Sequence, residues 1–215
     1  MPPPPRKRSP PLAWLAPALV AGSLAPLALI VYRAFTGKLG ANPIATALNQ
    51  LGLLALTLLV ACLACTPLKI VFGVKWPLRI RRTLGLLAFA VAVTHFLTYA
   101  LVDQGLALGA ILRDVTKRPF ITVGFFALVL LVPLALTSTK KSVARLGYAR
   151  WKRIHRLVYA AGVLVVIHFV MRVKADTREP LIWGVIVGVL LAVRGVDRAR
   201  AAMKEREKAR LAMGG

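Results

Sequence analysis

The sequence predicts an all-α, polytopic membrane protein with about six transmembrane helices. Three observations predict this fold: 58% of the 215 residues are hydrophobic, only 17% are charged, and the apolar residues are gathered into long blocks without charges. A soluble domain has about 25% charged residues, whereas a helix that crosses the hydrocarbon core needs about 20 consecutive apolar residues. The composition therefore excludes a soluble enzyme, a disordered basic tail and a disulfide-linked secreted domain.

The apolar blocks predict each span in turn. The first follows a leader rich in Pro and basic residues, and its length favours an uncleaved helix over a signal peptide. The second, third and fourth are long enough without charges, and the fifth begins among charged residues. The sixth is short, so Arg194 has to extend its side chain to the interface to complete the span. The predicted helices are 12–32, 46–66, 82–102, 119–137, 153–171 and 180–194.

The basic residues predict the orientation of these helices. Lys and Arg outnumber Asp and Glu by 30 to 7, and they concentrate in the leader, the second and fourth connections and the tail. The positive-inside rule then places both termini in the cytoplasm. The domains are a cytoplasmic leader, 1–11, a six-helix domain, 12–196, and a basic cytoplasmic tail, 197–215, which is a surface helix or disordered.

The net charge of +23 raises the question of a polyanionic partner. A protein that binds nucleic acid gathers its Lys and Arg on one face or arm. Here these residues occupy short segments between apolar blocks, where they orient the helices and attract anionic lipid. We expect the membrane lipid, and no nucleic acid, to be the anionic partner.

The three histidines predict a haem site. His95 lies thirteen residues after Arg82, and His168 lies thirteen residues after His155, on two helices that run in the same direction. Each interval is about 20 Å along a helix axis, so His95 and His168 share one depth near the outer leaflet, and Arg82 and His155 another near the inner leaflet. Two imidazoles that face each other across a bundle can be the axial ligands of a haem iron.

Small residues near these histidines fit either a flat ring or close helix packing. The small residues are Ala88, Ala92, Ala161 and Gly162, and close packing between membrane helices needs the same residue types. Thr94 or Thr98 is a candidate acceptor for the second ring hydrogen of His95, because a metal-bound histidine usually donates that hydrogen.

Other metal sites lack ligands in this sequence. There is no H-E-x-x-H motif, and the third and fourth spans contain no Asp or Glu, so a di-iron carboxylate site or a hydrolytic zinc site has no support. Cys62 and Cys65 form a single C-x-x-C on the second helix, which we interpret as two small packing residues. No triad of Ser, His and Asp is indicated.

Several segments resemble the MsrQ family (formerly YedZ). These are LACTPLK at 63–69, RRTLGLLAFAVAVTHFLTY at 81–99, KRPFITVG at 117–124, PLALTST at 133–139 and LGYARWKRIHRLVYAAGVLVVIHF at 146–169. MsrQ proteins are haem-binding membrane subunits of a bacterial methionine-sulfoxide reductase system, within the ferric-reductase-like membrane domain group. The resemblance implies a protein of the bacterial inner membrane that binds haem b and passes electrons to a periplasmic molybdopterin partner like MsrP. It also implies association with FMN, and electrons drawn from the quinone pool or a flavin donor.

The wider relatives hold two haems with two pairs of histidines, and this sequence departs from that pattern. The inner position on the third helix is Arg82, or Arg81, in place of a histidine. His155 is thus a candidate for a second haem, a flavin or a quinone site, and the two arginines are candidates for a haem propionate or a flavin phosphate, or are topology anchors.

The resemblance also implies that the sulfoxide chemistry belongs to the partner, so no catalytic residue is expected in this chain. Two competing functions remain. The first is a stand-alone transmembrane ferric or cupric reductase, although this chain has no room for the nucleotide-binding domain that such an activity usually needs. The second is a transporter or assembly factor without a cofactor.

Overall fold

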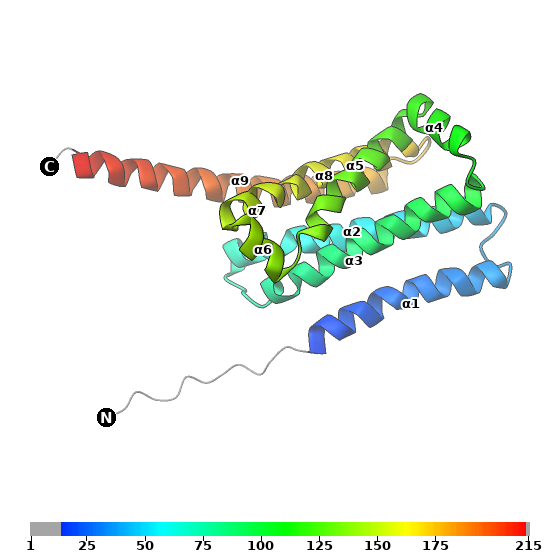
Figure 1. Ribbon diagram of the computed structural model, residues 1–215, viewed down its shortest axis with the longest axis horizontal. Coiled ribbons are helices and arrows are strands. Elements are labelled where there is room, and N and C mark those ends of the chain that lie inside the picture. The colour runs from blue at the N-terminus through cyan, green and yellow to red at the C-terminus, as the bar shows by residue number, and fades with distance from the viewer. Residues whose placement is uncertain (1–13, 214–215) are drawn as a thin grey trace.

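The computed structural model describes residues 14–213, and the regular elements in this part of the chain are all helices, without a strand (Figure 1). Six helical stretches are long and apolar enough to cross a membrane, so the predicted fold class is confirmed. The predicted leader, 1–11, lies outside the described residues. The elements are α1 (Leu15–Phe35), α2 (Pro43–Phe72), α3 (Pro77–Leu97), the π-helical turn η2 (Thr98–Asp103), α4 (Leu108–Lys117), α5 (Pro119–Leu136), α6 (Lys140–Leu146), α7 (Tyr148–Ile154), α8 (Leu157–Arg172) and α9 (Arg178–Met213).

Local signals fix where several helices begin and end. The Asn42 side chain caps α2 by accepting a hydrogen bond from the N–H of Ala45, and Pro43 occupies the first turn. Gly73 ends α2 in the left-handed conformation, with φ of 69°, which costs glycine little. Pro77 and Pro119 begin α3 and α5, where the missing N–H of proline costs no helical hydrogen bond.

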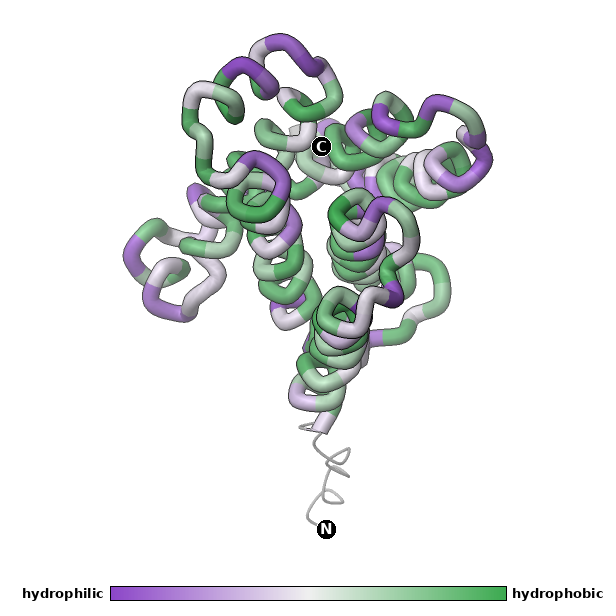
Figure 2. The backbone as a smooth tube through the Cα atoms, turned by 90° about the vertical axis from the view of Figure 1, so that its right-hand side faces the viewer, coloured by the Kyte–Doolittle hydropathy of each residue, from purple (hydrophilic) through white to green (hydrophobic). Residues whose placement is uncertain are grey.

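The bundle contains two closely packed helix pairs. α2 packs along α3, and α5 packs along α8, while α9 contacts both α2 and α8 and α1 lies outermost against α2 and α3 (Figure 1). The core between the pairs is apolar and includes Leu63, Leu84, Val91, Ala88 and Ala161. Hydrophilic residues gather in the connecting segments (Figure 2). This arrangement leaves the outward helix faces apolar, as a lipid environment requires.

The connections define two ends of the bundle, which we call the α4 end and the α6 end. The α4 end consists of the connections 36–42, 104–118 and 173–177, and the α6 end consists of 73–76 and 137–156. α4 and α6 lie at opposite ends (Figure 1). Neither short helix was predicted, because each lies in a charged connection where we counted only long apolar runs. α6 is capped by the Thr139 hydroxyl, which accepts from the N–H of Ser142.

The predicted helix bounds need three corrections. The second and third spans reach further than predicted, 43–72 and 77–103, because Lys and Arg are good helix formers and a helix does not stop where its apolar block stops. The fifth span is interrupted at His155 and Arg156, between α7 and α8. The sixth, predicted to end at 194, continues to Met213, so the described part of the predicted tail is a continuation of α9 rather than a separate segment.

The predicted role of Arg194 is wrong. Its side chain is 4% exposed, so it does not extend to an interface. Instead its Nη2 donates to the carbonyl of Leu63 at 2.5 Å, and its guanidinium lies 5.1 Å from the centre of the Tyr159 ring. The length of α9 explains the difference, because a helix of 36 residues spans without help from Arg194.

Candidate functional site

His95 on α3 and His168 on α8 face each other near the α4 end of the bundle. Their ring centroids are 6.4 Å apart, and the ring planes are almost perpendicular, at 84°. A nitrogen of a metal-bound imidazole lies about 2.0–2.1 Å from the metal, so two imidazoles on opposite sides of one metal ion hold their centroids about 6.3 Å apart. The spacing of these two rings therefore suits one metal ion between them, such as the iron of a haem.

Each histidine is oriented by a backbone carbonyl of a neighbouring helix. His95 Nδ1 lies 3.0 Å from the Leu48 oxygen on α2, and His168 Nδ1 lies 2.6 Å from the Phe120 oxygen on α5. A carbonyl oxygen only accepts, so Nδ1 carries the hydrogen in both rings. The Nε2 lone pair is left for a metal, and this is the tautomer in which histidine ligands are usually held.

The expectation that Thr94 or Thr98 accepts the hydrogen of His95 is wrong. Both hydroxyls instead donate to the carbonyls four residues earlier, Thr94 to Ala90 and Thr98 to Thr94. Such a bond inside a helix is the common alternative for threonine. The acceptor for His95 comes from another helix, which a search along α3 alone could not find.

Two glycines lie against the histidine rings, and the sequence reasoning missed both. A Cβ atom at Gly52 would lie 3.4 Å from His95 Cε1, and one at Gly124 would lie 2.7 Å from His168 Nδ1. Each glycine is four residues after the residue whose carbonyl holds the ring, Leu48 or Phe120. A side chain at that position leans over the preceding turn, so a glycine leaves the carbonyl open. In the sequence, the only indication of their role was that Gly52 and Gly124 lie in the apolar blocks that precede the helices of the histidines.

The small residues singled out near the histidines belong to the packed core. Ala88 and Ala161 are 1% and 0% exposed and lie in the main apolar cluster. A Cβ atom at Gly162 would lie 3.1 Å from the Leu63 side chain. Of the two explanations left open by the sequence, close helix packing accounts for these three residues.

A second candidate site lies at the α6 end, as a cavity of about 370 Å³. Arg81 and Arg82 of α3 line it together with His155 and Trp151, so the structure brings together the inner residues that the sequence singled out. The cavity also has polar lining from Ser138, Thr139 and Lys140. Three cationic side chains around one cavity suit an anionic ligand.

His155 is held differently from the other two histidines. Thr137 Oγ1 lies 2.6 Å from the Pro133 oxygen and 3.0 Å from His155 Nε2. The single hydroxyl hydrogen goes to the carbonyl, so the threonine oxygen accepts from Nε2–H and leaves the Nδ1 lone pair of His155 available. The Trp151 ring packs on His155 with centroids 4.1 Å apart, and its Nε1 donates to the Thr137 carbonyl at 3.0 Å.

The two cysteines are buried, unpaired thiols, and Cys62 lines this cavity. Cys62 donates to the carbonyl of Arg81 at 3.3 Å, and Cys65 donates to the carbonyl of Ala61 at 3.2 Å. Both belong to the main apolar cluster, which agrees with their interpretation as packing residues. The Arg81 guanidinium lies 3.5 Å from the Thr66 hydroxyl, which orients it along α2.

Comparisons with known proteins place this arrangement in a family. The family model described as ferric reductase like transmembrane component matches residues 50–167, which include His95 and His155 and end one residue before His168. A Deinococcus radiodurans protein named haem-binding subunit MsrQ of protein-methionine-sulfoxide reductase is 48% identical over 204 residues, covering 95% of this chain and 98% of the relative. The chain belongs to the MsrQ family. The predicted family membership is thereby confirmed.

Other MsrQ proteins are similar over most of their length. The relative from Rhodospirillum rubrum is 49% identical over 183 residues, covering 85% of this chain and 88% of the relative. The relative from Brucella ovis is 45% identical over 190 residues, covering 88% and 86%. Both carry the same name as the Deinococcus protein. No solved structure matches the chain.

Proposed function

We propose that this chain is a haem b electron-transfer subunit that passes electrons across the bacterial inner membrane to a periplasmic methionine-sulfoxide reductase. One observation carries the proposal: the His95 and His168 rings are spaced for a single metal ion, and both direct Nδ1 to a carbonyl. The relatives, named haem-binding subunits, support the same group.

The two histidines would hold the haem iron from opposite sides. An iron with imidazole on both sides can accept and release one electron, and it has no open position for oxygen or substrate. The Leu48 and Phe120 carbonyls keep each ring in the binding tautomer. The Gly52 and Gly124 positions let the rings approach their helices. No catalytic residue is needed in this chain, since the sulfoxide chemistry belongs to the partner.

The cavity at the α6 end is the proposed entry site for electrons. His155, Arg81 and Arg82 line it, and the candidates are a second haem, FMN or a quinone. Guanidinium groups bind carboxylates and phosphates well, so the two arginines suit the propionates of a haem or the phosphate of FMN. The donor is the quinone pool or a cytoplasmic flavin reductase. With both termini in the cytoplasm, this cavity lies on the cytoplasmic side.

Electrons would then leave at the α4 end, on the periplasmic side. Moving one electron outward is favourable by up to about 2.3 kcal/mol for each 100 mV of membrane potential crossed. The partner, a molybdopterin protein like MsrP, would dock on the connections at this end, 105–117 and 174–179. In the described structure these segments carry exposed side chains of both apolar and charged kinds, including Leu108 and Leu112.

An absorption spectrum tests the proposal. The full chain, expressed with ample haem and purified in detergent, should show a Soret band and a low-spin spectrum on reduction. His95→Ala and His168→Ala should each lose that spectrum. His155→Ala should keep the part of the spectrum that comes from the haem between His95 and His168. A colourless wild-type protein would end the proposal and favour a transporter or assembly factor. Turnover on ferric chelates without a partner would favour a stand-alone metal reductase.

A further inference from the structure

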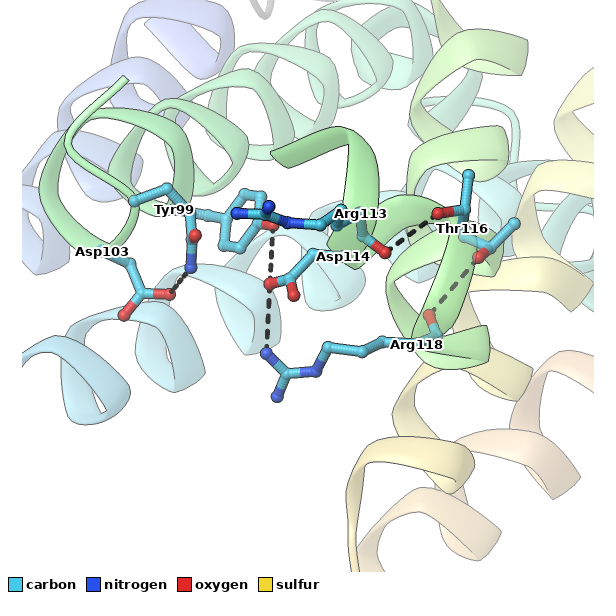
Figure 3. Close-up of polar contacts among 8 residues, drawn as sticks. Tyr99, Asp103, Arg113, Asp114, Thr116 and Arg118 are labelled. Carbon is cyan, nitrogen blue, oxygen red and sulfur yellow. Dashed lines mark hydrogen bonds and ion pairs between the residues drawn. The ribbon is translucent and has the colours of Figure 1, made fainter. Parts of the chain in front are cut away.

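Three polar side chains form a connected cluster at the α4 end, which we call the outer clamp: Tyr99, Asp114 and Arg118 (Figure 3). One carboxylate oxygen of Asp114 accepts from the Tyr99 hydroxyl and from Arg118 Nη1, both at 3.1 Å. Asp114 is partly buried, with 23% of its side chain exposed, while Arg118 is half exposed. A carboxylate held by two donors is a fixed point between η2, α4 and the start of α5.

The outer clamp reaches His168 through Phe120. The Arg118 guanidinium lies over the Phe120 ring, 5.0 Å from its centroid, and the Phe120 ring packs on the His168 ring at 6.1 Å. The Phe120 carbonyl accepts from His168 Nδ1. The position of this carbonyl is thus set by the corner between α4 and α5, which Arg118 and Asp114 hold together.

The same cluster reaches the helix of His95. Tyr99 lies four residues after His95, in the π-helical turn η2 that follows α3. Four residues is one helical turn, so Tyr99 and His95 lie on the same side of their helix. A second link in this corner is the Thr122 hydroxyl of α5, which donates to the Val115 carbonyl of α4. The clamp therefore connects the corner that positions the Phe120 carbonyl with the helix that carries His95.

We propose that the outer clamp is a positioning device that sets the strength of the hydrogen bond from His168 Nδ1 to the Phe120 carbonyl, and through it the reduction potential of the iron. This inference rests on the proposed haem site. A strong bond from the ring nitrogen to an acceptor makes the imidazole a better electron donor. It stabilises ferric iron over ferrous iron and lowers the potential. Loosening the clamp weakens the bond and raises the potential.

The inference is testable because a purely electrostatic effect of these residues on the reduction potential would differ from an effect of position. Asp114→Asn removes a negative charge and Arg118→Gln removes a positive one, from two side chains that contact each other at 3.1 Å. If these residues acted only as charges, the first substitution would raise the potential and the second would lower it. If they act by position, both raise it. Tyr99→Phe changes no charge and removes one donor, so it should raise the potential as well.

The experiment is a potentiometric titration of the purified holoprotein, wild type and variants, followed by the low-spin haem spectrum. Asp103→Asn is the matched control, because Asp103 lies at the same end and contacts Gln104 without joining the clamp. We expect Asp114→Asn, Arg118→Gln and Tyr99→Phe to shift the midpoint potential upward, each by more than the control, with haem content unchanged.

Two results would overturn the inference. One is opposite shifts for Asp114→Asn and Arg118→Gln, and the other is shifts no larger than that of Asp103→Asn. If a charge variant does not fold, Tyr99→Phe alone decides, since it loses only a hydroxyl. A wild-type protein without a low-spin haem spectrum would instead refute the proposed function, so the two failures are distinguishable.

Discussion

His95 and His168 are held by the same construction, used twice. In each case a neighbouring helix offers a carbonyl to Nδ1 and, four residues later, a glycine to the face of the ring. The pairs are Leu48 with Gly52 and Phe120 with Gly124. Because a side chain at the glycine position would cover the carbonyl, the glycine and the hydrogen bond depend on each other.

Gly124→Ala tests this dependence. The new Cβ would lie 2.7 Å from His168 Nδ1, so the ring has to move away from the Phe120 carbonyl. We expect most of the low-spin haem spectrum to be lost, although alanine is a better helix former than glycine by about 0.5–1 kcal/mol. Gly52→Ala, with a contact of 3.4 Å, should lose less. Gly188→Ala, which meets nothing within 4 Å, is the control and should match the wild type.

The angle between the two rings predicts a magnetic signature. The ring planes lie at 84°, and perpendicular axial imidazoles leave the two iron orbitals that they contact nearly equal in energy. The ferric protein should then give a strongly anisotropic low-spin signal in electron paramagnetic resonance, dominated by one low-field feature. A rhombic signal with three resolved features would mean parallel rings and would contradict this geometry.

Among the elements, α9 differs most from its predicted form. It continues for 36 residues, and its C-terminal part extends past the bundle at the α6 end (Figure 1). The apolar blocks predicted all six spans, because their length is a property of the sequence alone. The apolar blocks could not predict where each helix ends, because charged residues can continue a helix. They also could not give the turn at His155, which depends on the contacts of that residue with Thr137 and Trp151.

Arg194 provides the prediction for this element. Its Nε and Nη1 are buried without a partner in the described structure, while Nη2 has the Leu63 carbonyl. A buried donor without a partner costs about 1–3 kcal/mol, and an apolar side chain of similar length avoids that cost. We therefore expect Arg194→Met to leave the melting temperature in detergent unchanged or higher. Leu63→Met, a swap of similar volume in the same contact, serves as the control.

A marked fall in the melting temperature of Arg194→Met would contradict this expectation. It would mean that the guanidinium makes a stabilising contact beyond the Leu63 carbonyl and the Tyr159 ring. The fall should then exceed that of Leu63→Met, whose cost is that of repacking alone, usually below about 1.5 kcal/mol.

For the whole molecule, the two sites lie at opposite ends of one bundle. The spacing of thirteen residues predicted that His95 and His168 share a depth, because two parallel helices translate equal intervals into equal heights. It could not predict the carbonyl partners, since these depend on how α2 and α5 are placed beside α3 and α8. The cavity at the α6 end could not be predicted from the sequence either, because it also depends on how the helices are placed. Three of its lining residues were nevertheless singled out: Arg81, Arg82 and His155.

The orientation of the bundle decides the direction of the proposed electron transfer, and the last prediction concerns this orientation. The connections at the α6 end carry more basic residues than those at the α4 end, including Lys75, Lys140 and Lys141, so we expect the α6 end in the cytoplasm. Ala175→Cys, at the α4 end, should react with a membrane-impermeant maleimide in intact spheroplasts. Lys141→Cys, at the α6 end, should react only after permeabilisation. Both positions are exposed in the structure.

The native cysteines should not interfere with the labelling, because both are buried. Cys62 and Cys65 are 7% and 2% exposed, so the unsubstituted protein should give little background and is the control. The reverse pattern would place the His95 and His168 site on the cytoplasmic side. Electrons would then have to move inward against the membrane potential to reach it from the cavity, and a periplasmic partner would have to take them from the cavity end instead.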